Sequence, residues 1–92
     1  MHTSRVGIEF DPAKALANMR KHKVSFAHAE RVLRDPMAVT IKDPDLEYEQ
    51  RLITLGADAL GRVLVVHTSR GDRTRLISAR KASRGEAENY DA

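Results

Sequence analysis

Hydrophobic and polar residues in the first third of the chain follow helical spacing after one short strand. Residues 6–10 have the composition of a strand. Asp11 followed by Pro12 is a typical helix start, because aspartate caps free backbone N–H groups and proline suits the first helical position. The helix is predicted to run to about Lys21 and to pack on a sheet through a broad apolar surface: Ala13, Ala15, Leu16, Ala17 and Met19.

Two further helix starts are marked by serine residues. Ser25 precedes a segment in which apolar residues recur at helical spacing, and the Asp35-Pro36 pair ends this segment. Ser83 is followed three residues later by Glu86, which is the spacing of a capping box. The chain therefore predicts a second helix directly after the first and another near its C-terminal end.

From residue 37 onward the alternation changes to a period of two, which is typical of strands. Strands are predicted over residues 37–42, 51–56, 62–69 and 72–79, with an acidic loop over 43–49. The 62–69 segment is almost continuously apolar, so it is expected at the centre of the sheet. The order β-α-α-β-β-β-β-α predicts an α+β fold: one small domain, residues 1–92, with an antiparallel sheet packed by helices.

The last two strands are predicted to form a hairpin that turns on residues 70–71, since the glycine there adopts a positive φ readily. In that register Val66 faces Arg75, and Arg73 shares a face of the sheet with Arg75. His67 then lies on the opposite face, whereas a loop of different length shifts these neighbours.

Composition limits the class of protein. The 92 residues carry a formal net charge of +3 and no cysteine, so disulfides and a thiolate nucleophile are excluded and a reducing compartment is expected. No stretch approaches the roughly 20 apolar residues that span a bilayer, and the first residues lack the apolar core of a signal peptide. We expect a soluble, cytoplasmic protein without a membrane partner. Its four histidines are scattered, so neither a metal site nor a cofactor is expected.

Positive charge is concentrated in residues 70–84, which hold six basic side chains and one acidic one. Five of the six are arginines, whose planar guanidinium matches two phosphate oxygens at once. The loop 43–49 holds four acidic residues and no basic one, so the basic character is local. The segment favours recognition of a nucleic-acid backbone; the alternative is a solvated strand face that only aids solubility.

Several ordered blocks of the sequence resemble the BrnT family of bacterial toxins: FDPAKALANMRKHKVSF, DPDLEYEQRLITLG and GRVLVVHTSRGDRTRLISARKASR, followed by Glu86 and Tyr90. The resemblance covers nearly the whole chain, and RLISARKAS with Glu86 and Tyr90 is its most specific element. It implies a RelE-like fold and a ribonuclease that is the toxin of a type II toxin–antitoxin system, neutralised by a BrnA-type antitoxin. Two departures stand out: Lys23, where the family commonly has glycine, and a last helix with fewer basic residues.

The resemblance implies a metal-independent endoribonuclease that inhibits translation and growth. RNA would be cleaved by attack of a ribose 2′-hydroxyl on the adjacent phosphorus, which needs a base, an acid and a cation near the phosphoryl oxygens. We expect Arg80 to supply the cation and His67 to transfer protons, although a histidine in an apolar strand is also a common structural residue. Further RNA contacts are expected from Arg73, Arg75, Lys81, Arg84 and Tyr90. Tyr90 either stacks on a base or packs the last helix on the sheet, and Glu49 is a second candidate base.

Two other functions stay open on the sequence. One is a non-catalytic module that kept the fold and binds nucleic acid or antitoxin. The other is a direct DNA binder, which is disfavoured because no helix-turn-helix with a basic second helix is present. In a toxin–antitoxin pair, operator DNA would be bound indirectly through the antitoxin, and the expected substrate is RNA, either free or as ribosome-bound messenger.

Overall fold

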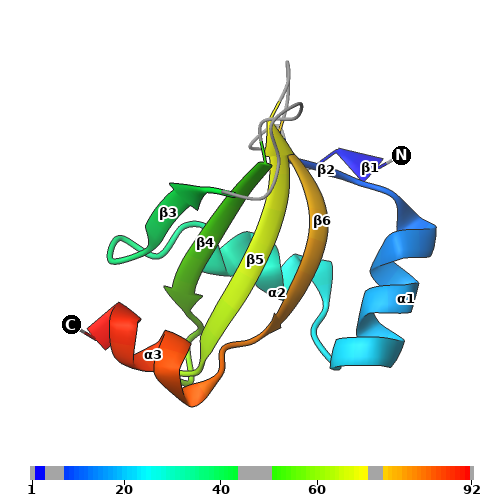
Figure 1. Ribbon diagram of the computed structural model, residues 1–92. Coiled ribbons are helices and arrows are strands. Elements are labelled where there is room, and N and C mark those ends of the chain that lie inside the picture. The colour runs from blue at the N-terminus through cyan, green and yellow to red at the C-terminus, as the bar shows by residue number, and fades with distance from the viewer. Residues whose placement is uncertain (1, 4–7, 44–50, 71–73, 92) are drawn as a thin grey trace.

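The structure is a computed structural model that describes residues 2–3, 8–43, 51–70 and 74–91. Within these ranges six strands form one sheet in the order β1-β2-β6-β5-β4-β3, and three helices accompany it (Figure 1). The elements in chain order are β1 (His2–Thr3), β2 (Ile8–Phe10), α1 (Pro12–His22), α2 (Phe26–Val32), β3 (Val39–Lys42), β4 (Arg51–Ala57), β5 (Val63–Arg70), β6 (Thr74–Lys81) and α3 (Arg84–Asp91). None of the described helices is long and apolar enough to cross a membrane.

The sheet confirms the predicted α+β fold class and corrects the strand directions. β5 lies between β4 and β6, so the most apolar strand is central as expected. Neighbouring strands from β3 to β6 pair antiparallel, as do β1 and β2, but β2 runs parallel to β6. The sheet is therefore mixed rather than antiparallel. Between β2 and its parallel partner β6 the chain passes through α1, α2 and three strands. The sequence pattern does not predict β1, since a pair of residues shows no periodicity.

Helices α1 and α2 pack on one face of the sheet. The core between them is formed by buried apolar side chains of α2 and of the central strands: Phe26, Ala29, Val32, Leu64, Val66, Leu76 and Ala79. Figure 1 shows α2 behind β4, β5 and β6, with α1 to one side of them. α3 instead contacts β4 at the end of the sheet. This arrangement leaves the opposite face of the sheet free of α1 and α2.

The caps of α1 and α2 are those that the sequence predicts. Asp11 accepts a hydrogen bond from the backbone N–H of Ala13 (2.9 Å), and Ser25 accepts one from the backbone N–H of His28 (3.0 Å). Lys23 ends α1 with φ 60°, the left-handed conformation that favours glycine. The connection between the two helices is therefore tight and strained at one lysine.

α1 meets the sheet through a buried asparagine rather than through its large apolar residues. The predicted packing of α1 on the sheet is confirmed, since α1 contacts β6 and Ala15 packs against the core. Leu16 and Met19, however, are about half exposed. Asn18 is 6% exposed, and its Nδ2 donates to the carbonyls of Val24 and Ala79 at 2.9 Å each. Its Oδ1 accepts from the N–H of Ala79 at 3.1 Å. β2 pairs with the start of β6, and farther along β6 the Asn18 amide acts as a neighbouring strand would.

The register of the β5–β6 hairpin differs from the predicted one. Ser69 pairs with Arg75, whereas a turn on residues 70–71 would put Arg75 opposite Val66. An irregularity directly after His67 inserts one extra residue into β6, so that His67 pairs with Ser78. Because residues two apart in a strand share a face, Arg75 lies on the same face as His67, contrary to the prediction.

A glycine lets α2 pack closely on β4. A Cβ atom added at Gly56 would lie 2.8 Å from both Cγ1 and the carbonyl oxygen of Val32. Since one of these atoms belongs to the helix backbone, the contact has no flexible side chain that can move away. A larger residue at this position would push α2 from the sheet.

Candidate active site

The face of the sheet opposite α1 and α2 carries the predicted catalytic residues. We call it the open face and define it by His67, Ser69, Arg75, Ser78 and Arg80. His67 follows a core residue of β5 and therefore points away from the helices. Ser78 pairs with His67, and Arg80 pairs with the next open-face position of β5, so both side chains emerge on the same side.

His67 is half-buried and held by Ser78. The Oγ of Ser78 and the Nδ1 of His67 are 3.1 Å apart, in a hydrogen bond whose donor depends on the histidine tautomer. Burial lowers the pKa of His67 and the positive charge of Arg80 lowers it further, against the opposing charges of Asp43 and Glu86. The ring is therefore neutral at pH 7, and its Nε2 makes no hydrogen bond within the described residues.

Arg80 forms a bidentate ion pair with Glu86 of α3. Nη1 and Nη2 donate to Oε1 and Oε2 at 2.8 and 2.9 Å, and the arginine side chain remains 38% exposed. Glu86 also completes the predicted capping box, because Oε1 accepts from the N–H of Ser83 (2.9 Å). The bonds from Arg80 and Ser83 lower the pKa of Glu86 to about 2, and Glu86 raises the pKa of Arg80 above its ordinary value. Arg80 is thus a fixed cation, already engaged by an internal carboxylate.

Arg75 and Lys81 do not join the site around the histidine. Arg75 lies near the start of β6, where its guanidinium is 3.9 Å from the carboxylate of Glu9. Lys81 ends β6 and pairs with Leu64, a core residue, so it faces the side of α1 and α2. Arg73 lies outside the described residues. The basic side chains that were predicted to act together are therefore divided between the two faces.

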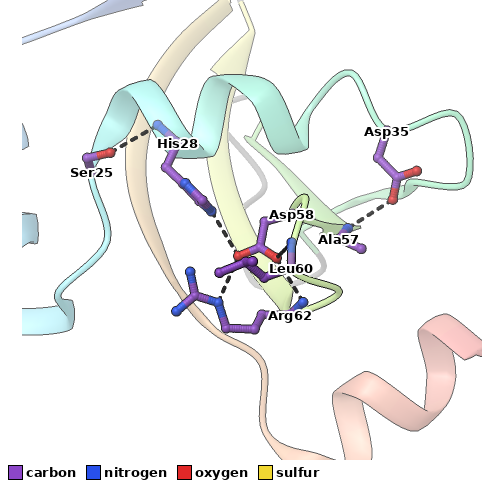
Figure 2. A network of polar contacts seen from close by, with 7 residues as sticks. All are labelled: Ser25, His28, Asp35, Ala57, Asp58, Leu60 and Arg62. Atoms are coloured by element: carbon purple, nitrogen blue, oxygen red, sulfur yellow. Dashed lines mark hydrogen bonds and ion pairs between the residues drawn. The ribbon is translucent and has the colours of Figure 1, made fainter.

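Arg84 and Tyr90 both lie on α3. The Arg84 side chain is almost fully exposed at the start of the helix, 3.7 Å from Glu88. The hydroxyl of Tyr90 donates to Asp35, which also accepts from the N–H of Ala57 at 2.9 Å (Figure 2). These bonds, that of Tyr90 first, lower the pKa of Asp35. Tyr90 therefore ties α3 to the connection between α2 and β3, and its contact with RNA stays a prediction.

The sequence pattern does not reveal Ser78, Asp43 or Arg51 as neighbours of His67. Ser78 is missed because the predicted hairpin register lacks the inserted residue of β6. Asp43 and Arg51 act on His67 through their charges, and the N–H of Asp43 donates to the carbonyl of Arg51 at 2.8 Å. The pairing of β3 with β4 could have indicated this juxtaposition. Glu49, the second candidate base, lies outside the described residues.

The open-face site combines a neutral imidazole with a fixed guanidinium. An imidazole accepts or donates a proton near neutral pH, and a guanidinium stabilises negative charge on phosphoryl oxygens. In the part of the chain that the structure describes, no three His, Cys, Asp or Glu side chains are grouped as ligands of a metal ion. The arrangement suits proton transfer beside a phosphate.

Comparisons with known proteins identify the family of this chain. A family model described as ribonuclease toxin, BrnT, of type II toxin–antitoxin system matches residues 10–86, which confirms the resemblance seen in the sequence. Among solved structures, the chain is similar to the 1.1 Å crystal structure of the Brucella abortus ribonuclease toxin BrnT, with a TM-score of 0.64 and 27% identity. That match covers 84% of this chain and 96% of the Brucella chain. No curated protein sequence matches.

Proposed function

Because the chain belongs to the family of BrnT ribonuclease toxins of type II toxin–antitoxin systems, we propose that it is an endoribonuclease whose active site lies on the open face. One observation carries this placement: a neutral, half-buried His67 and the cation of Arg80 emerge side by side from β5 and β6. RNA would be cleaved by its own 2′-hydroxyl without a metal ion. Loss of RNA would then inhibit translation and growth.

Arg80 would stabilise the negative charge that develops on the phosphoryl oxygens. Glu86 and the carbonyl of Lys81 occupy both hydrogens of Nη1 and one hydrogen of Nη2. Among the described residues, the Nε–H and the second hydrogen of Nη2 make no hydrogen bond, so they can meet a phosphate. Since the carboxylate of Glu86 offsets part of the positive charge, a phosphate competes with Glu86 for the same cation.

His67 would transfer the protons. When its Nδ1 donates to Ser78, the lone pair of Nε2 can accept the 2′ proton. The imidazolium formed in this way can then donate the Nε2 proton to the leaving 5′ oxygen and return to the neutral state. The lowered pKa of His67 keeps the ring neutral at pH 7, as a base requires. Glu86 is unsuited to this role, because a carboxylate with a pKa of about 2 is a weak base.

Other basic residues would hold the phosphates that flank the cleaved bond. Arg75 extends the open face along β6, and Arg84 lies exposed at the start of α3, next to the Arg80–Glu86 pair in the chain. Arg73 and Tyr90 are proposed as further RNA contacts. Arginine suits these positions, because its guanidinium binds phosphate oxygens in pairs.

The family implies an antitoxin partner, and we propose one of the BrnA type. An acidic or apolar segment of the antitoxin would cover the open face and silence the nuclease. The complex would bind operator DNA through the antitoxin, with this chain as corepressor. The substrate would be cytoplasmic RNA, either free or as messenger on the ribosome.

The Arg80–Glu86 ion pair also favours a second candidate function. A non-catalytic module that binds nucleic acid or antitoxin could keep its arginine permanently paired with an internal carboxylate. Such a module would bind RNA with salt-dependent affinity and release no product. Its behaviour separates it from a nuclease in a single assay.

Cleavage of end-labelled RNA by the antitoxin-free protein in EDTA tests the proposal. We expect wild-type protein to produce 2′,3′-cyclic phosphate ends and Arg80→Ala to cleave on the order of 100-fold more slowly. Arg20→Ala, at an exposed position of α1, is the matched control and should cleave at the wild-type rate. RNA binding by folded wild-type protein without product would favour the non-catalytic module, and unimpaired cleavage by Arg80→Ala would place the site elsewhere.

A further inference from the structure

A basic pocket lies on the side of the sheet away from His67. It has a volume of about 200 Å³ and is lined by residues from the α1–α2 connection, α2, β5 and the end of β6, among them Lys23, Ser25, His28, Arg62 and Lys81. Drug-sized ligands occupy pockets of about 300–1,000 Å³, and a water takes about 30 Å³ of liquid. The pocket therefore suits a group of a few heavy atoms, such as a phosphate, rather than a whole nucleotide.

The negative charge of Asp58, beside this pocket, is already balanced by partners within the protein. Asp58, with 2% of its side chain exposed, contacts His28 Nε2 and Arg62 Nε at 2.9 Å each and accepts from the N–H of Leu60 (Figure 2). Burial raises the pKa of Asp58, but these bonds and that of the Arg62 N–H lower it to about 2. In Figure 2 the terminal nitrogens of Arg62 point away from Asp58, and none of the described residues hydrogen-bonds them. Arg62 therefore retains donors for an anion.

The two lysines of the pocket leave it with a positive charge. Lys23 and Lys81 are exposed and form no ion pair within the described part of the chain. Lys23 occupies a left-handed backbone conformation in which glycine would be unstrained. The backbone of Lys23 ends α1, and its side chain adds a cation to the lining of the basic pocket.

Two consecutive residues of β6 link the pocket to the proposed active site. Arg80 and Lys81 are neighbours at the end of β6 and face opposite sides of the sheet. Resting on the proposed function, we infer that the pocket is a phosphate subsite, in which Lys23, Lys81 and Arg62 hold a backbone phosphate of the RNA strand after it passes around the end of β6. The cleaved phosphate would then lie at Arg80 and another phosphate of the same strand would lie in the pocket.

Salt-dependent binding of a non-cleavable 2′-O-methyl RNA tests this subsite. Each phosphate contact to a single strand contributes about 0.7 to the magnitude of the slope of log affinity against log salt. Since the three cations hold one phosphate, Lys23→Gln with Lys81→Gln should lower this magnitude by about 0.7. The control Lys14→Gln with Lys42→Gln has the same net charge and changes exposed lysines outside the pocket. Its slope should stay close to that of the wild type.

A second variant separates lost binding from lost folding. Lys23→Gly removes the charge and relieves the left-handed strain, so its Tm should rise while the magnitude of its slope falls by part of that decrease of about 0.7. Equal slopes for the two double variants would overturn the subsite. So would a pocket that binds inorganic phosphate in a protein whose RNA affinity does not change when the two lysines are replaced. If wild-type protein cleaves ordinary RNA in either case, the proposed function survives; if it neither binds nor cleaves RNA, both proposals fail together.

Discussion

Asn18 is expected to be a major source of stability, and it also positions the active-site strand. Its side chain makes three hydrogen bonds: two to Ala79, which lies between Ser78 and Arg80, and one to Val24, next to the strained end of α1. Ala79 is fully buried, so water does not replace the lost partners. The substitution Asn18→Ala therefore removes three bonds and leaves the buried backbone of β6 unsatisfied.

The magnitude follows from these bonds. Loss of one partner from a buried hydrogen bond costs about 1–3 kcal/mol, because the group left behind is unsatisfied. Asn18→Ala leaves three backbone groups in this state, so it should lower the free energy of unfolding by at least about 3 kcal/mol. Small domains have about 5–15 kcal/mol in total. Asn18→Asp keeps the acceptor for the Ala79 N–H but loses both donors. It should be destabilised at pH 7 and recover in part at acid pH, where the carboxyl group carries a proton.

Urea unfolding followed by circular dichroism measures both changes, with Asn89→Ala on the exposed surface of α3 as the control. The control should stay within about 0.5 kcal/mol of the wild type. A loss below about 1 kcal/mol for Asn18→Ala, with an unchanged m-value, would refute the view that this amide completes the edge of β6.

Three further predictions concern packing, acid stability and charge. Gly56→Ala should destabilise the fold by about 1–3 kcal/mol, because its Cβ would meet Val32 at 2.8 Å; urea unfolding without such a loss would show that α2 is free to shift. The hydrogen bonds that lower the pKa of Asp58 from 3.8 to about 2 contribute about 2 kcal/mol to the free energy of unfolding. This contribution is present above about pH 4 and is lost as the pH falls through about 2. Measured as a function of pH, the stability of Asp58→Asn should lack this acid loss, and identical curves for the variant and the wild type would contradict the prediction. Glu86→Gln removes the charge that opposes Arg80, so fluorescence anisotropy at low salt should show RNA affinity about fivefold higher, equivalent to about 1 kcal/mol; unchanged or weaker binding would mean that Arg80 does not meet a phosphate.

Local signals in the sequence predict the helices well, because each depends on a few neighbouring residues. The Asp11 and Ser25 caps lie where the sequence places them, and α1 ends at His22, one residue after the predicted Lys21. The parallel pairing of β2 with β6 was not predictable in this way, since it joins segments separated by most of the chain. The part that Asn18 plays in the packing of α1 was not predicted either, because a buried amide that bonds to a strand edge looks like a polar surface residue in a helical pattern.

The candidate site was predicted in part. His67 and Arg80 emerge on one face as a site requires, although the inserted residue in β6 changes their neighbours and hides Ser78. One extra residue in a strand reverses which side chains face each other, and its position depends on the packing of both strands. The separation of Lys81 from Arg80 has a simpler origin, because consecutive strand residues point to opposite faces.

Neighbouring residues of β6 provide the most direct test that RNA is cleaved on the open face. Single-turnover cleavage of labelled RNA should be measured with wild-type protein, Arg80→Ala and Lys81→Ala over a range of enzyme concentrations. We predict a maximal rate constant on the order of 100-fold lower for Arg80→Ala. For Lys81→Ala we predict a nearly unchanged maximal rate that is reached only at higher enzyme concentration, since it contributes to binding alone. Equal maximal rates for Arg80→Ala and wild type, or a larger loss for Lys81→Ala, would show that RNA is not cleaved at Arg80 on the open face.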